Sequence, residues 1–227
     1  MGKRPTYKGV VFDFDGVLYD SERYWMELEV NYIERHLSGW DRSDYIHLTG
    51  RPISEVYEIL RARGLSLTET QYLKDYEAMA CHVYGSLVHP LPHVDSLLSQ
   101  LSMNHVSLAI ASSSSRAWID LALRSSPLPV ELSMIASAAD PEVQRGKPAP
   151  DVYLRAAHLL NAPPDSLIAI EDSQHGVAAA RSAGLYTIGL KNGFNEEQDL
   201  SDAHELMRGY HPKTLPRALT DLICLSI

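Results

Sequence analysis

Cysteine is scarce in this chain, with two residues, Cys81 and Cys224, among 227. They lie far apart in the sequence and form no CxxC pair, so the spacing gives no sign of a disulfide framework or a redox motif. Reduced thiols are the default for so few cysteines, and we expect the reducing environment of the cytoplasm.

Long apolar runs and an excess of positive charge are also lacking. No apolar stretch approaches the roughly 20 residues that a membrane-spanning helix needs, and we expect neither a signal peptide nor a membrane association. The formal net charge is −9, which argues against a nucleic-acid-binding surface. An anionic substrate would need a local positive centre in such a protein, and a metal ion would supply one.

The chain does contain an apolar run that ends in two aspartates. The segment VVF at 10–12 is followed by Asp13, Phe14, Asp15 and Gly16. Such a run is typical of a fully buried strand at the centre of a parallel sheet. Buried unpaired carboxylates are costly, so this pair needs a cation, a proton or both. The competing interpretation is an ordinary turn, rich in Asp and Gly, that closes a strand.

The rest of the chain divides by its periodicity. Between residues 20 and 90 the patterns are helical, whereas later strand patterns alternate with helical ones, which favours a parallel sheet with helices on both faces. We predict an α/β protein with a Rossmann-like parallel-sheet core, residues 1–19 and 91–227, and an inserted all-helical cap domain, residues 20–90. The strands after the first are expected at 106–111, 134–136, 167–170 and 186–190, and 186–190 is expected to be the last.

Polar residues follow the other predicted strands. A serine run at 112–115 comes after the second strand, and Glu171 and Asp172 come after the fourth. Lys147 lies between them in a loop that contains glycine and proline. Because the carboxyl ends of parallel strands share one edge of a sheet, we expect these groups to meet Asp13.

This collection suits the transfer of a phosphoryl group from a phosphate ester. Mg²⁺ prefers hard oxygen ligands and would neutralise the repulsion between carboxylates and phosphate. Serine hydroxyls, backbone amides and a lysine ammonium would bind the phosphate oxygens. The expected phosphate-binding residues are Ser112, Ser113 and Lys147, and the expected metal ligands are Asp13, Asp15, Glu171 and Asp172, together with a backbone carbonyl near Asp15.

The two aspartates would divide the work. Asp13 would attack phosphorus in line and form an aspartyl-phosphate, and Asp15 would protonate the leaving alkoxide and then activate water. Each feature taken alone has a plainer interpretation. The serines can cap a helix, Lys147 can be a solvated loop charge, and Glu171 with Asp172 can cap the next helix. Their coincidence at successive strand ends favours a catalytic site.

Four segments in this order resemble the haloacid dehalogenase-like (HAD) hydrolase superfamily: DFDGVLYDSE, AIASSSSR, GKPAPDVYL and IEDSQHGVAAARSAGL. They are similar to the subgroup that holds β-phosphoglucomutase, phosphoglycolate phosphatase and sugar-phosphate phosphatases. The resemblance covers about residues 7–202, and it implies Mg²⁺, the aspartyl-phosphate mechanism and a helical cap that closes over the substrate. It also implies that Arg51, in the segment TGR at 49–51, reaches the polar end of the substrate.

The resemblance leaves several functions to weigh. Asp15 disfavours a dehalogenase, because halide departure needs no acid. Trp25 stands where the mutases of the subgroup have a cap histidine, which favours a phosphatase over a β-phosphoglucomutase-like mutase. A third alternative is a non-catalytic binding protein on this fold, and the complete set of Asp13, Asp15, Lys147 and Asp172 argues against it. We expect a phosphatase for a small phosphorylated metabolite of the sugar-phosphate type, acting as a monomer without a nucleic-acid partner.

Overall fold

The computed structural model describes residues 7–48 and 53–223, and the chain forms two compact units. The first unit combines Met1–Asp20 with His89–Ile227, and the second is Ser21–Val88. The chain leaves the first unit after Asp20 and returns to it at His89. These two residues are neighbours, since the backbone amide of Asp20 donates to the carbonyl of His89 at 3.0 Å. The second unit is therefore an insertion between two neighbouring segments of the first.

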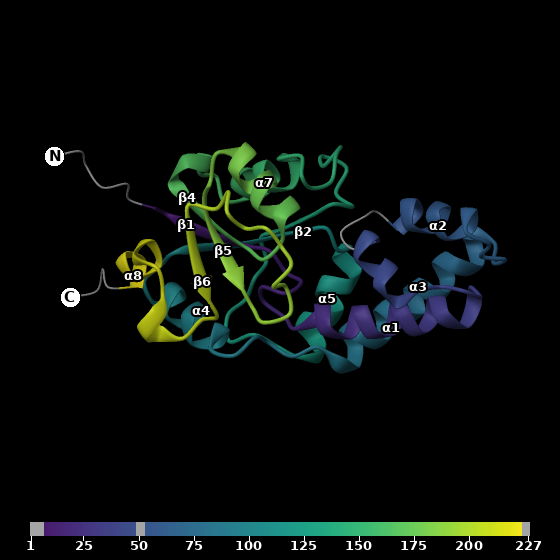
Figure 1. The fold of residues 1–227 in the computed structure, drawn as a ribbon. Helices are drawn as coiled ribbons and strands as arrows, with labels where there is room; N and C mark the ends of the chain where they lie inside the picture. The colour runs from purple at the N-terminus through teal and green to yellow at the C-terminus, as the bar shows by residue number, and fades with distance from the viewer. Residues whose placement is uncertain (1–6, 49–52, 224–227) are drawn as a thin grey trace. The chain divides into compact units, whose positions relative to one another are not determined.

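The first unit is built on a six-stranded sheet in which every neighbouring pair is parallel (Figure 1). The spatial order is β3-β2-β1-β4-β5-β6, so the first strand lies in the interior of the sheet. This sheet confirms the predicted Rossmann-like α/β class. The strands are β1 (Gly9–Phe12), β2 (Ser107–Ser112), β3 (Ile135–Ser137), β4 (Leu167–Glu171), β5 (Tyr186–Lys191) and β6 (Glu205–Arg208).

Helices cover the sheet on both faces (Figure 1). The α6 and α7 side is packed with small residues: Val11 and Ala109 of the sheet join Ala156, Ala179 and Ala180 of the helices in one buried cluster. Side chains this small let the helices approach the strands closely. The helices of this unit are α4 (Val94–Met103), α5 (Arg116–Ser125), α6 (Asp151–Leu159), α7 (Gln174–Ala183) and α8 (Arg217–Ile223), with 3₁₀ turns at Pro164–Ser166 and Pro212–Thr214.

The prediction that 186–190 is the last strand is wrong. A sixth strand, β6, pairs in parallel with β5 at the edge of the sheet. Its sequence is ELMR, and Met207 is its one buried residue. An edge strand with one apolar side chain facing the core does not produce the continuous apolar run that identifies a central parallel strand.

Helices joined by short loops make up the described residues of the second unit, 21–48 and 53–88. Its core is rich in aromatic residues, with Tyr32, Tyr57, Leu60 and Tyr72 buried together. Its elements are α1 (Ser21–His36), a 3₁₀ helix (Arg42–His47), α2 (Ile53–Ala62), α3 (Glu69–His82) and a π-helical turn (Val83–Leu87). Among the helices of the described chain, none combines the length and the apolarity that crossing a bilayer requires.

Trp25 belongs to the packing of this helical unit. Its indole ring stacks on Tyr76, with ring centroids 4.8 Å apart, and its Nε1–H donates to the hydroxyl of Tyr84 at 3.1 Å. The side chain is buried, and its one polar atom is satisfied inside the unit. Trp25 therefore has a structural role that a histidine could not fill in the same way.

Helix α4 provides a direct test of the core assignment in the first unit. Leu101 is fully buried, whereas Met103 is 69% exposed on the same helix. Leu101→Ala is expected to lower the free energy of unfolding by about 2–5 kcal/mol, because it leaves a cavity. Met103→Ala is the matched control and should change it by no more than about 0.5 kcal/mol. Denaturant unfolding of the two variants makes the comparison, and equal losses would contradict the assignment.

Candidate active site

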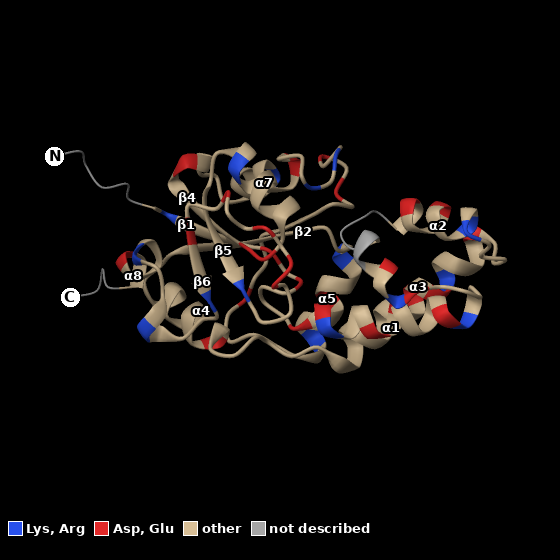
Figure 2. Ribbon diagram, viewed as in Figure 1, with Lys and Arg blue, Asp and Glu red and all other residues tan. Residues whose placement is uncertain are grey.

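The site begins where β1 ends. Asp13 follows Phe12 directly, and its backbone amide donates to the carbonyl of Ile170 in β4 at 2.9 Å, so the carboxylate is fixed at the sheet edge. Gly16 then turns the chain with φ +71°, and its amide donates to the carbonyl of Tyr19 at 2.8 Å. Figure 2 shows the acidic segments, in red, gathered beyond the ends of the central strands.

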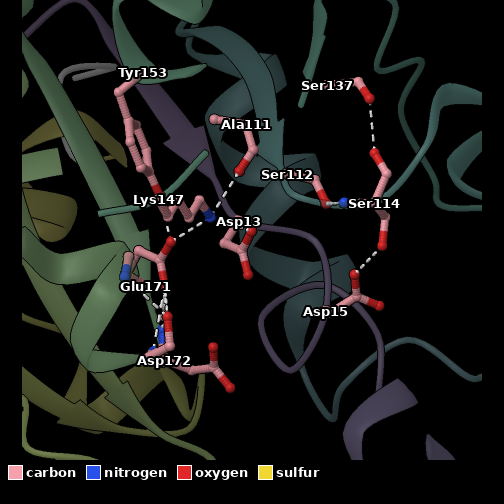
Figure 3. Close-up of polar contacts among 12 residues, drawn as sticks. Asp13, Asp15, Ala111, Ser112, Ser114, Ser137, Lys147, Tyr153, Glu171 and Asp172 are labelled. Carbon is pink, nitrogen blue, oxygen red and sulfur yellow. Dashed lines mark hydrogen bonds and ion pairs between the residues drawn. The ribbon is translucent and has the colours of Figure 1, made fainter. Parts of the chain in front are cut away.

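Lys147 is the centre of the site (Figure 3). Its Nζ lies 2.7 Å from Oδ1 of Asp13 and 2.5 Å from Oε1 of Glu171, and it donates to the carbonyl of Ala111 at 3.2 Å. The side chains of Lys147 and Asp13 are 7% and 9% exposed, and that of Glu171 is fully buried. The ammonium therefore joins the ends of three strands, β1, β2 and β4, in a region that water scarcely reaches.

Burial and the neighbouring charges shift the pKa values of Asp13 and Lys147. Burial raises the pKa of Asp13 well above its usual range; Lys147 opposes this, and Glu171 and Asp15 add to it. Burial alone would lower the pKa of Lys147, but the carboxylates of Asp13 and Glu171 outweigh it and raise that pKa above its usual value. The lysine is therefore firmly protonated, and the site carries more negative than positive charge.

The carboxylate of Glu171 is surrounded by donors. Oε1 accepts from Lys147 and from the Tyr153 hydroxyl, the latter at 2.7 Å. Oε2 accepts from the backbone amides of Asp172 and Ser173 at 3.1 and 3.3 Å, and from the Ser173 hydroxyl at 3.1 Å. Burial, followed by the charge of Glu171, raises the pKa of Tyr153 well above its usual range, so its hydroxyl stays a donor. These contacts orient Glu171 toward Lys147.

Three acidic side chains lie close enough to share a cation. Ligand oxygens of Asp13, Glu171 and Asp172 all lie within 4.8 Å of one another, and all three residues are buried. With each carboxylate ionised, three negative charges and the positive charge of Lys147 leave a formal charge of −2. Carboxylate oxygens in a buried site of this charge fit a hard divalent cation such as Mg²⁺. The Asp15 side chain is not part of this group.

Asp15 is held on the other side of Asp13, by the serine run. The Ser114 hydroxyl donates to Oδ2 of Asp15 at 2.6 Å, and the Ser137 hydroxyl donates to the carbonyl of Ser114 at 2.7 Å (Figure 3). Ser112 is buried, and its Oγ accepts from the Ser114 amide at 2.9 Å. Ser113 is exposed at the same strand end. The run thus brings Ser112, Ser113 and Ser114 to the edge where Asp13 lies.

The capping interpretation of these motifs applies to their last residues. Ser115 caps α5, with its hydroxyl accepting from the Trp118 amide at 3.3 Å, and Ser173 caps α7, accepting from the Gly176 amide at 3.0 Å. Ser112, three residues before Ser115, and Glu171, two residues before Ser173, instead face the site. Arg51, the residue expected to reach the substrate, lies outside the described residues.

Sequence reasoning missed several residues that support the site. Ser114 belongs to the serine run at 112–115, so the motif itself could have suggested its contact with Asp15. Tyr153 occupied an apolar position of a predicted helix, where nothing marks its hydroxyl as a partner of Glu171. Asn192 and Asn195 follow β5 and contact Asp172, and a loop of polar residues gives no signal of that contact.

Known proteins resemble this chain over most of its length. It is 30% identical to a validoxylamine A 7′-phosphate phosphatase of Streptomyces hygroscopicus over 202 residues, 89% of this chain and 93% of the relative. It is also 30% identical to the β-phosphoglucomutase of Bacillus subtilis over 196 residues, 82% and 84% of the two chains. A solved structure of a β-phosphoglucomutase-type protein from Thermotoga maritima has a TM-score of 0.74 and 26% identity, and the match covers 95% of this chain and 98% of that one.

These matches confirm the predicted enzyme class, a phosphomonoester hydrolase of the HAD type, at the level of the family. Residues 10–190 match the family described as haloacid dehalogenase-like hydrolase, a range that contains Asp13, Lys147 and Asp172. With these residues gathered at the carboxyl edge of a parallel sheet, the chain belongs to the haloacid dehalogenase-like hydrolase family.

Proposed function

We propose that this protein is a Mg²⁺-dependent phosphatase that hydrolyses a small phosphorylated metabolite, of the sugar-phosphate type, through an aspartyl-phosphate. The observation that carries the proposal is the buried contact of Lys147 with Asp13, 2.7 Å long, beside two further carboxylates. A nucleophilic carboxylate needs a neighbouring positive charge to receive an anionic phosphate ester. Relatives that are named phosphatases support the reaction type.

In the first step a carboxylate oxygen of Asp13 attacks phosphorus. The new O–P bond forms as the bond from phosphorus to the ester oxygen breaks, and Asp15 donates its proton to the departing alkoxide. Lys147 and the serine edge at Ser112 and Ser113 bind the phosphoryl oxygens. Lys147 thereby compensates negative charge on both the nucleophile and the transferring group.

In the second step Asp15 removes a proton from water, the water oxygen bonds to phosphorus, and the bond to Asp13 breaks. The products are inorganic phosphate and the regenerated Asp13 carboxylate. Asp13, Asp172 and the backbone carbonyl of Asp15 would hold Mg²⁺, with Glu171 completing the acidic group. When bound, the ion supplies charge neutralisation between the carboxylates and the phosphate.

A mutase is the second candidate, because a β-phosphoglucomutase is among the relatives at 30% identity. The two activities share the first step and differ in what accepts the phosphoryl group from Asp13. Trp25, at the position expected for the mutase histidine, is buried against Tyr76 and Tyr84 and carries no titratable group. This observation favours water as the acceptor.

Activity measurements with a panel of sugar phosphates and small phosphorylated metabolites test the proposal. We expect release of inorganic phosphate that requires Mg²⁺, stops on addition of a chelator and falls to background in Asp13→Asn. An isomerised sugar phosphate without phosphate release would identify the mutase instead. A purified, folded protein with neither activity across the panel would leave the non-catalytic alternative.

Asp15→Ala is expected to lower turnover on alkyl phosphates by about 10²–10⁴-fold, the usual contribution of a general acid–base. An aryl phosphate with a good leaving group needs no proton in the first step, so the aspartyl-phosphate should form and then accumulate. Trapping of labelled phosphoenzyme after rapid acid quench measures this intermediate. Unchanged turnover on alkyl phosphates would remove Asp15 from its proposed role.

Gly176→Ala tests the support beneath Lys147. A Cβ at Gly176 would lie 1.9 Å from the Glu171 carboxylate, so the substitution must displace the group that holds Lys147. Replacing glycine by alanine inside a helix normally stabilises it by about 1 kcal/mol. Here we expect both a lower melting temperature and reduced phosphatase activity. The matched control is His175→Ala, an exposed position of the same helix, which should change neither. A stabilised, fully active Gly176→Ala would show that Glu171 has no positioning role.

A further inference from the structure

The loop that follows β5 packs around Asp172, one of the acidic residues of the proposed metal site. It comprises residues 191–198, which we call the asparagine bracket. Two of its side chains contact Asp172, the residue that directly follows β4. We propose that Asn192, supported by Asn195, is a positioning residue that sets the affinity of Asp172 for a divalent cation. This inference rests on the proposed function, since it assigns a role within the same site.

The amide of Asn192 joins two parts of the site. Its Nδ2 donates to Oδ2 of Asp172 at 3.0 Å and to the backbone carbonyl of Gly16 at 2.8 Å. Its Oδ1 accepts from the backbone amide of Phe194 at 2.9 Å, which fixes the orientation of the amide because a backbone N–H needs an acceptor. Both amide hydrogens are therefore directed to Asp172 and to the turn after Asp15.

Asn195 holds the backbone of the same aspartate. Its side chain is 6% exposed, and its Nδ2 donates to the carbonyls of Asp172 at 2.6 Å and Leu190 at 2.8 Å. Its Oδ1 accepts from the backbone amide of Asn192 at 3.1 Å. The two asparagines thus fix both the main chain and the carboxylate of Asp172, and they also brace each other.

The bracket is itself closed by further contacts. The ammonium of Lys191 donates to the carbonyls of Asn195, Glu196 and Gln198 at 3.0, 3.1 and 2.7 Å. Gln198 Oε1 accepts from the amide of Gln174, the first residue of α7, at 2.9 Å. The loop is therefore tied to the helix that follows Asp172. A segment with this many internal hydrogen bonds can act as a rigid support.

A neutral amide suits this position for an electrostatic reason. A lysine or arginine beside Asp172 would compete with a cation for its charge, and a carboxylate would repel it. An amide donates a hydrogen bond and leaves the net charge in place. The fit is also tight on the other side, because a Cβ at Gly16 would lie 2.1 Å from Oδ2 of Asp172. Asn192 therefore keeps Asp172 and the turn carrying Asp15 at a fixed separation.

Calorimetric titration of the full-length protein with Mg²⁺ or Mn²⁺, in the absence of substrate, tests the inference. Asn192→Ala should raise the dissociation constant for the cation by about 10–100-fold, the usual effect of losing a partner that orients a metal ligand. Asn192→Ser, which is smaller but keeps a neutral donor, provides a second variant should the alanine variant fold poorly. Glu197→Gln, at an exposed position of the same loop, is the matched control and should bind as the wild type does.

Thermal unfolding without metal separates positioning from a merely structural role. If the Asn192 variants melt at a lower temperature but bind the cation with wild-type affinity, the inference is overturned. Asp172→Asn in the same titration separates the inference from the proposed function. Wild-type cation binding by Asp172→Asn would defeat the proposed metal site itself. Loss of binding in Asp172→Asn with unchanged binding in both Asn192 variants would defeat only the role of Asn192.

Discussion

The ammonium group of Lys147, shared between two buried carboxylates, is the interaction on which the rest of the site depends. Asp13 comes from the end of β1 and Glu171 from the end of β4, and both contact the same Nζ. Without the ammonium group, two carboxylates buried this close together would repel each other strongly. Removing one member of such a buried cluster typically costs about 3–5 kcal/mol, because the remaining charge has lost its partner. The lysine thus stabilises this end of the sheet and opposes the rise in the pKa of Asp13 that burial causes.

Each acidic group at this edge is supported from a different part of the chain. Glu171 is fixed by Tyr153 of α6, Asp172 by the asparagine bracket after β5, and Asp15 by Ser114 after β2. The supports converge because parallel strands bring all their carboxyl ends to one side. A site held in this way is preorganised before a substrate arrives, which is how fixed charges and dipoles lower a reaction barrier.

The sequence was most informative where burial was complete. The runs at 10–12 in β1 and 167–170 in β4 are apolar because both faces of these strands are covered, so their positions and the carboxylates that follow these runs could be predicted. The serine run was found for a related reason, since polar residues directly beyond a buried strand need a chemical explanation. Lys147 was identified instead as the lysine of a loop that contains glycine and proline. β6 escaped detection because an edge strand buries little, and Met207 alone does not make a pattern.

By itself, the sequence determined that the protein is an α/β fold, that a helical segment interrupts it, and that Asp13, Lys147 and Asp172 lie at one edge. These conclusions follow from local periodicity and from the parallel sheet. Only the tertiary structure decided what holds those groups. Tyr153, Asn192 and Asn195 reach the site through contacts of 18 to 176 residues in sequence separation, and such contacts leave no local pattern. Hydrogen bonds between side chains depend on where backbones meet in space, and that is settled only when the whole sheet has formed.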